Sequence, residues 1–205
     1  MELLLIRHGL PVRRELVEGP ADPELSAAGL AQAEHLADYL ESEPIDALYA
    51  SPLQRAHQTI LPLAGRKGLE VGIVDAVAEW DRNSSEYVPV EELKASNDPR
   101  YHALMRGEWS DRDETPEEFH ARVVDAVEGL IAAHPGQRIA VSCHGGVINA
   151  FLAHVLGLEV GSSVTYPNYT SIHRIAASRS GVKTIQTVNE TAHLRGTGLP
   201  IGLLG

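Results

Sequence analysis

Short apolar runs, each followed by polar residues or glycine, recur along the chain and predict buried strands. The first run covers residues 3–7, where the letters LLLIR stand directly before a histidine and a glycine. Similar runs predict five further strands, at residues 47–50, 71–74, 138–142, 170–177 and 182–189. These segments are the expected strands of one central sheet.

A helix is expected directly after Ser26, which can serve as its N-cap. Leu25 and Leu30 stand at the two positions of a hydrophobic staple around this serine. The apolar face of this helix repeats at helical spacing and consists of Leu30, Ala33, Ala37 and Leu40. The pattern therefore predicts an amphipathic helix.

Two tetrads predict the first turns of further helices. Ser51-Pro52-Leu53-Gln54 offers a serine N-cap, a proline at the first helical position and a glutamine that completes a capping box, and the helix extends to about residue 64. The second capping box is Thr115-Pro116-Glu117-Glu118. The apolar face of the long helix that follows consists of Phe119, Val123, Val127, Leu130 and Ile131. A fourth helix is expected at residues 147–156.

Alternation of strands with helices predicts an α/β fold around a mostly parallel sheet. Between residues 80 and 114 the pattern loosens into short polar pieces that contain proline and aspartate. We interpret residues 80–114 as a cap insertion over the edge of the sheet. The 205 residues contain no internal repeat or low-complexity linker, so residues 1–205 are expected to form a single domain.

The net charge and the cysteine content exclude several kinds of binding partner and of structural site. The formal net charge of -11 argues against nucleic acid and anionic membranes, because both require a basic surface. An anionic substrate would therefore need a local basic pocket. The single cysteine, Cys143, excludes an internal disulfide and a cysteine-based zinc site. The apolar start of the chain is too short for a signal peptide or a membrane span, so we expect a cytoplasmic protein.

Three polar motifs follow predicted strands, at the positions where open α/β sheets bind ligands. They are Arg7-His8-Gly9, the segment from Ser51 to Arg55, and His144-Gly145-Gly146. The carboxyl ends of parallel strands meet at one edge, so two histidines and two arginines are expected to converge there. Arginine binds phosphate oxygens bidentately, and helix N-termini add backbone N–H groups.

Each motif alone also has an ordinary structural interpretation. A histidine at a strand end is more often structural than catalytic, and Arg55 alone would be a solvated helix residue. His144 and its two glycines alone would be a tight turn between strand and helix. The order and placement of all three motifs favour a phosphate-binding active site.

With these motifs, the sequence resembles the histidine phosphatase superfamily, also called phosphoglycerate mutase-like. The resemblance covers nearly the whole chain and lies in LLLIRHG, LSAAGLAQA, YASPLQRAHQT, VSCHGGVI and NETAHL. It implies a three-layer α/β/α sandwich, a histidine nucleophile, and no metal or other cofactor.

The resemblance also implies a role for individual residues. His8 corresponds to the nucleophile, and Arg7, Arg55 and His144 correspond to the residues that bind the transferred phosphoryl group. The acid/base carboxylate of the family usually follows the third strand, where Glu79 in AVAEWD is the best match.

Two segments depart from the family pattern. Members commonly have a hydroxyl residue and then an asparagine soon after RHG, where this chain has LPVRR. Arg13 or Arg14 is the natural replacement for that phosphate contact, although both could equally be solvated loop charges. The family's glycine-rich stretch after the acid is also absent, which leaves Asp81 and Glu86 as alternatives to Glu79.

The predicted function is that of a metal-independent phosphatase of small phosphorylated metabolites, acting through a phosphohistidine. A phosphoglycerate mutase-type transfer and a catalytically inactive phospho-ligand-binding module are the alternatives. A metal site made only of histidines is disfavoured, because arginines beside His8 would repel a cation. The sequence identifies neither the particular substrate nor the oligomeric state.

Overall fold

A six-stranded sheet forms the centre of the computed structural model, which describes residues 1–106 and 114–202. The strand order is β4-β3-β6-β1-β7-β8, and β7 runs antiparallel to both of its neighbours while β1, β3, β4 and β6 are parallel. The strands of this sheet are β1 (Glu2–Arg7), β3 (Ala47–Ala50), β4 (Val71–Ile73), β6 (Arg138–Cys143), β7 (Ile172–Ala177) and β8 (Lys183–Glu190). The expected mostly parallel sheet is confirmed, with strand ends that differ by one or two residues.

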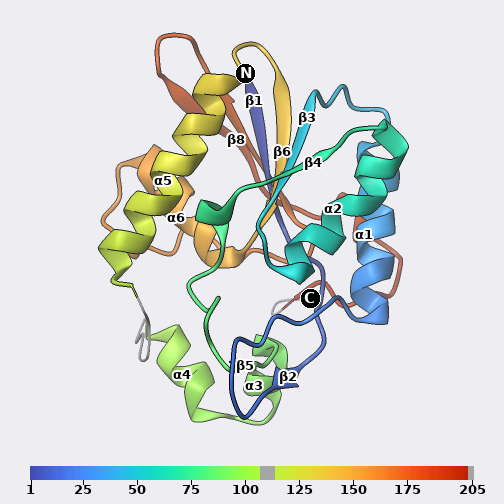
Figure 1. Cartoon of the computed structure of the whole chain (residues 1–205), viewed down its shortest axis with the longest axis vertical. Coiled ribbons are helices and arrows are strands. Elements are labelled where there is room, and N and C mark those ends of the chain that lie inside the picture. Colours follow the sequence, from blue (N-terminus) through green and yellow to red (C-terminus); the bar gives the residue numbers. More distant parts are fainter. Residues whose placement is uncertain (107–113, 203–205) are drawn as a thin grey trace.

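Helices cover both faces of the sheet and give the expected α/β/α sandwich (Figure 1). One face carries α1 and α2, and the other carries α5 and α6. The four helices are α1 (Ala27–Leu40), α2 (Gln54–Lys67), α5 (Pro116–Ala133) and α6 (Gly145–Leu156). Among the residues described, none of the helices is long and apolar enough to cross a membrane.

The alternation of side chains along β1 explains why residues 3–6 of this strand are all apolar. Leu3 and Leu5 pack in the core beneath α5 and α6, whereas Leu4 and Ile6 pack in the core beneath α1 and α2. All four are fully buried. A central parallel strand buried on both faces therefore needs an unbroken apolar run.

The predicted apolar face of α1 is wrong at its first position. Leu30 is 51% exposed, and Gly29 and Gln32 are buried in its place. Gly29 faces the loop after β1, because a Cβ atom on it would lie 2.1 Å from the carbonyl oxygen of Leu10. Ser26 is the N-cap as expected, because its side chain accepts from the N–H of Gly29.

The predicted capping box at residues 51–54 is also wrong. Helix α2 begins at Gln54, its N-cap is Leu53, and no side chain caps it. The hydroxyl of Ser51 instead contacts His144 and accepts a hydrogen bond from the N–H of Leu53. The capping box at Thr115 and Glu118 is confirmed, since both of its reciprocal hydrogen bonds are present.

The segment predicted as a cap lies beyond the carboxyl ends of the parallel strands, in the lower part of Figure 1. Its described part contains β5 (Glu86–Tyr87), α3 (Val90–Ala95) and α4 (Pro99–Met105), and residues 107–113 lie outside the described residues. β5 pairs with β2 (Arg14–Glu15), a strand from the loop after β1 that the sequence pattern did not predict. Two segments that are far apart in the sequence therefore form this region, which we call the cap.

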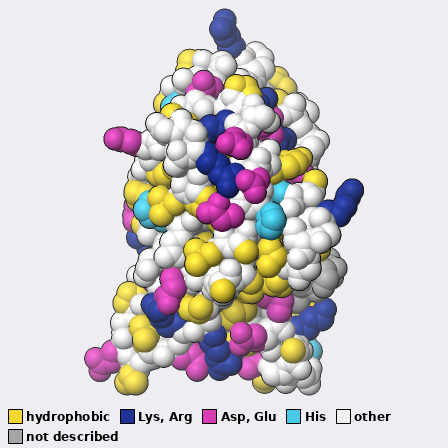
Figure 2. Space-filling view, turned by 90° about the vertical axis from the view of Figure 1, so that its right-hand side faces the viewer, with side chains coloured by type: hydrophobic (Ala, Val, Ile, Leu, Met, Phe, Trp, Pro, Cys, Tyr) yellow, Lys and Arg dark blue, Asp and Glu magenta, His cyan; other side chains and the backbone are white. Residues whose placement is uncertain are grey.

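The face formed by α1 and α2 carries acidic and basic side chains side by side (Figure 2). Arg66 of α2, for example, pairs with Glu34 and Asp38 of α1. These pairs connect the two helices on the solvent side, opposite the apolar contacts with the sheet.

Candidate active site

His8 directly follows β1 and is buried at the carboxyl end of that strand, with 3% of the residue exposed. Its Nδ1 lies 2.7 Å from the carbonyl oxygen of Gly9. Because a carbonyl oxygen only accepts hydrogen bonds, Nδ1 carries the proton and Nε2 keeps its lone pair. Burial, and then the charges of Arg55 and Arg7, lowers the pKa of His8 well below its usual value. The neutral imidazole is therefore able to act as a nucleophile.

The turn that presents His8 is held against α1 by a close approach of two backbones. A Cβ atom on Gly9 would lie 2.8 Å from the carbonyl oxygen of Gly29, a separation that real Cβ atoms essentially never show. The N–H of Gly9 also donates to Oγ1 of Thr59 on α2, over 2.9 Å. The glycine after the histidine is therefore required by packing, and it fixes the backbone that carries His8.

Arg7 is the last residue of β1 and its guanidinium is held from two sides. Its Nη1 donates to the carbonyl oxygen of Pro167 over 2.6 Å. Its Cζ lies 4.4 Å from the ring centre of Tyr169, within the range of a cation–π contact. The guanidinium is thus fixed in direction before any ligand binds.

Arg55 lies in the first turn of α2 and is 1% exposed. By volume it is the largest fully buried side chain among the described residues. Its Nη2 donates to Oδ1 of Asp81 over 2.8 Å. Its Cζ lies 4.7 Å from the ring centre of Tyr87. The structure therefore explains why a charged helix residue is buried: it has a carboxylate partner and an aromatic surface.

His144 is the N-cap residue of α6 and is completely buried. Its ring centre lies 5.3 Å from that of His8, and its Nε2 lies 2.7 Å from Oγ of Ser51. Ser51 can donate its hydroxyl proton to Nε2, which leaves Nδ1–H free as a donor. Burial, followed by the charge of Arg55, lowers the pKa of His144 well below its usual value.

Three buried nitrogen atoms of these residues have no hydrogen-bond partner within residues 1–106 and 114–202. They are Nε of Arg7, Nε of Arg55 and Nδ1 of His144. Both arginines act electrostatically on His8, and His144 contacts it. Buried donors are almost always paired in folded proteins, so this group is suited to a ligand that supplies acceptors. Two cations and a histidine donor around a neutral imidazole fit a phosphoryl group.

Glu79 is buried at the N-terminus of α6. Its Oε2 accepts from the N–H of Gly146 over 2.8 Å, and its Oε1 accepts from the N–H of Trp80 over 3.1 Å. Burial first, and then the charge of Asp81, raises the pKa of Glu79 to about 7, against the opposing effect of these N–H groups and of Arg55. A carboxyl group with this pKa exchanges protons readily at neutral pH.

The two alternative acids have different surroundings. Asp81 is the ion-pair partner of Arg55 at 2.8 Å. Glu86 pairs with Arg100 at 2.9 Å, and its side chain is 47% exposed. Of the three candidate carboxyls, Glu79 is the buried one, and its raised pKa suits an acid.

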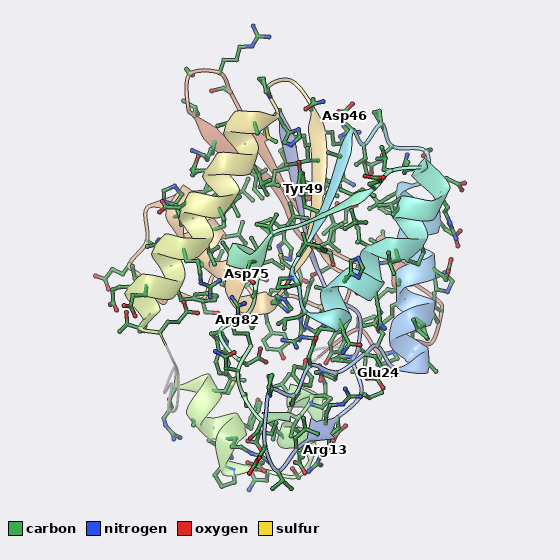
Figure 3. All side chains as sticks on the ribbon, in the orientation of Figure 1. Arg13, Glu24, Asp46, Tyr49, Asp75 and Arg82 are labelled. Atoms are coloured by element: carbon green, nitrogen blue, oxygen red, sulfur yellow. The ribbon has the colours of Figure 1, made fainter. Side chains whose placement is uncertain are left out.

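Arg13 and Arg14 are engaged with carboxylates of the cap region. Arg13 pairs with Glu15 at 2.6 Å and with Glu92 at 3.4 Å, and its side chain is 50% exposed. Arg14 pairs with Glu24. Figure 3 shows Arg13 beside β2, in the lower part of the molecule. The structure therefore brings Arg7, Arg55, His8 and His144 together. The guanidinium groups of Arg13 and Arg14 bind carboxylates elsewhere and do not belong to this cluster.

Three tyrosines that the sequence patterns did not single out lie beside His8 or Arg7. The ring centres of Tyr87 and Tyr169 lie 6.5 Å and 6.1 Å from that of His8, and the ring of Tyr166 lies 5.8 Å from Cζ of Arg7. Burial raises the pKa of Tyr87 and of Tyr166 to about 12, so both hydroxyls stay protonated at neutral pH. The only signal in the sequence is that the chain has few tyrosines, six in all, and three of them lie here.

The chain is similar to known proteins over nearly its whole length. The model of the histidine phosphatase superfamily (branch 1) matches residues 3–191. Phosphoserine phosphatase 1 of Hydrogenobacter thermophilus is 29% identical over 206 residues, which cover 95% of this chain and 94% of that protein.

Solved structures show the same fold. A mutant phosphoserine phosphatase of Entamoeba histolytica, in complex with phosphoserine, superimposes with a TM-score of 0.75 at 24% identity, over 94% of this chain and 98% of that one. A mycobacterial glucosyl-3-phosphoglycerate phosphatase superimposes with a TM-score of 0.73 at 22% identity, over 93% and 99%.

Proposed function

We propose that this chain, which belongs to the histidine phosphatase superfamily (branch 1), hydrolyses its substrates through a phosphohistidine on His8. The chain is a phosphoric monoester hydrolase that acts on small phosphorylated metabolites. The observation that carries the proposal is a set of three buried nitrogens, on Arg7, Arg55 and His144, that are unpartnered among the described residues and lie in side chains beside a neutral His8.

The first chemical step transfers the phosphoryl group to the protein. Nε2 of His8 forms a bond to phosphorus, and the bond between phosphorus and the ester oxygen breaks. The donors of Arg7, Arg55 and His144 stabilise the charge on the equatorial oxygens, and their fixed positions avoid reorganisation during the step. Protonated Glu79 gives its proton to the departing alkoxide, which leaves as an alcohol.

The second step returns the protein to its starting state. Glu79, now ionised, takes a proton from a water molecule, and the resulting hydroxide attacks the phosphohistidine. The bond between phosphorus and Nε2 breaks, inorganic phosphate is released, and Glu79 is again protonated. A pKa of about 7 suits both halves, because the same carboxyl must give and then accept a proton near neutral pH.

The experiment that tests this function is a turnover screen over phosphorylated metabolites in the presence of excess EDTA. The proposal expects release of inorganic phosphate by the native protein, inhibition by vanadate, and no release by the His8→Ala variant. Turnover that EDTA abolishes and a divalent ion restores would contradict the metal-independent route. Turnover that survives His8→Ala would contradict the nucleophile.

A further inference from the structure

A second carboxylate, Glu91 of α3, lies on the cap side of the site. The hydroxyl of Tyr169 donates to its Oε2 over 2.8 Å. The ring of that tyrosine contacts both Arg7 and His8. Glu91 therefore belongs to the shell of side chains around Arg7 and His8, on the side of the site that the cap forms.

The other carboxylate oxygen of Glu91 is buried and unpartnered. Within residues 1–106 and 114–202, Oε1 of Glu91 has no hydrogen-bond partner. Burial without a donor costs free energy for a carboxylate oxygen, so an unpartnered atom of this kind calls for an explanation. The carboxylate of the adjacent Glu92, by contrast, is exposed to solvent and pairs with Arg13.

The surroundings of Glu91 indicate which kind of ligand group would donate a hydrogen bond to its Oε1. Its charge acts on Arg7 and on three tyrosines, Tyr87, Tyr166 and Tyr169. Arg7 already donates to a backbone carbonyl, and its unpartnered Nε belongs to the cluster assigned to phosphate. A carboxylate among aromatic rings attracts an ammonium group and repels a second anion.

We propose that Glu91 is a specificity-determining residue whose Oε1 accepts a hydrogen bond from an ammonium group on the leaving alcohol. The preferred substrates are then phosphate monoesters of amino alcohols, in which a cation lies a few bonds from the ester oxygen. This inference rests on the proposed function of the same site, since the phosphate must first bind at Arg7, Arg55 and His144.

The test compares two esters of nearly equal size. Phosphoethanolamine carries an ammonium group where n-propyl phosphate carries a methyl group. We expect the native protein to prefer phosphoethanolamine in kcat/KM by about 10–100-fold, the usual range for a hydrogen bond to a charged group. Glu91→Gln should bring the ratio of the two kcat/KM values close to one, because its loss of kcat/KM falls mainly on phosphoethanolamine.

The variants distinguish recognition of the ammonium group by Glu91 from its hydrogen bond with Tyr169, which supports the ring of that tyrosine. Glutamine keeps a carbonyl oxygen that can accept from Tyr169, so the ring over Arg7 stays in place in Glu91→Gln. The matched control is Glu92→Gln, which neutralises the adjacent exposed carboxylate and should leave the ratio unchanged. An equal loss on both esters in Glu91→Gln, or a native protein without preference, overturns the inference alone. Absence of His8-dependent turnover on any ester overturns the proposed function and this inference together.

Discussion

Oε2 of Glu79 accepts a hydrogen bond from the backbone N–H of Gly146 over 2.8 Å, and the missing side chain of that glycine makes room for the carboxyl group. A Cβ atom on Gly146 would lie 2.3 Å from Oε1 of Glu79. The second glycine after His144 is thus needed to make room for the carboxyl group of Glu79. The motif His144-Gly145-Gly146 therefore connects the proposed phosphate-binding residue His144 with the proposed proton donor Glu79.

Gly146→Ala is expected to lose activity with little loss of stability. The methyl group meets the flexible end of Glu79, which can move, so the fold persists while the acid leaves its position. Loss of general acid catalysis typically costs about 10²–10⁴-fold, and we expect kcat on alkyl phosphates to fall toward that range. Steady-state kinetics and thermal unfolding of the same preparation check this result.

The matched control for that variant is Gly145→Ala, one residue earlier in the same helix. A Cβ atom at Gly145 would meet nothing within 4 Å. Gly145→Ala should therefore keep near-native activity. Equal losses in both alanine variants would show that the helix N-terminus, and not the space for Glu79, is what matters.

Glu79→Gln is expected to separate substrates by their leaving group. An alkoxide needs a proton to depart, whereas a nitrophenolate barely does. The variant should lose about 10²–10⁴-fold in the phosphorylation of the protein by alkyl phosphates, and much less with p-nitrophenyl phosphate. The measurement is the pre-steady-state burst, because later hydrolysis needs Glu79 as a base with either substrate. Equal losses in the two bursts would remove Glu79 from the acid role and make Asp81 the next substitution.

The pH dependence of the same burst follows from the raised pKa of Glu79, about 7. The protonated form is required for an alkyl leaving group, and it disappears as pH rises through about 7. The rate of phosphorylation by an alkyl phosphate should therefore fall above that value, by about tenfold per pH unit at the limit. The burst with p-nitrophenyl phosphate serves as the control and should lack this decline. An alkyl burst that stays level through neutrality would contradict the assignment.

Arg55→Lys is expected to keep the charge and lose the reaction. Lysine preserves a cation opposite Asp81 but has no planar fork and no Nε donor for a phosphoryl oxygen. Removal of one such donor typically costs about 10²–10³-fold in kcat. Arg66→Lys, in the same helix but paired with Glu34 and Asp38, is the control and should be near native. Near-native turnover by Arg55→Lys together with a lowered melting temperature would make Arg55 structural.

The signals for the strands and for both histidine motifs are local, which is why the sequence predicts them well. The run before His8 is apolar because β1 is buried on both faces, and such a run shows directly in the letters. The glycines beside His8 and His144 show equally directly. Because parallel strands end at one edge of the sheet, the convergence of Arg7, Arg55 and His144 could be predicted without coordinates.

Other parts of the site depend on contacts between distant segments. Tyr87 and Glu91 come from the cap, and Tyr169 precedes β7, so no spacing in the sequence indicates that they meet. Ser51 matches a capping pattern, but its hydroxyl contacts His144 instead, because that histidine is buried and needs a partner. Leu30 matches the helical period and is exposed, because Gly29 packs against the loop after β1. In each case tertiary packing, and not the local sequence pattern, determines the contacts of the side chain.

The most direct test of the account is the chemical stability of the phosphorylated protein. Rapid quench after mixing with a substrate that carries a radiolabelled phosphoryl group should trap the label on the native protein. A phosphoramidate on His8 predicts that the label is released in acid and retained in base, and that peptide mapping places it on the peptide that contains His8. The His8→Ala variant should take up no label. Label that survives acid, or that persists in His8→Ala, would contradict a phosphohistidine at this position.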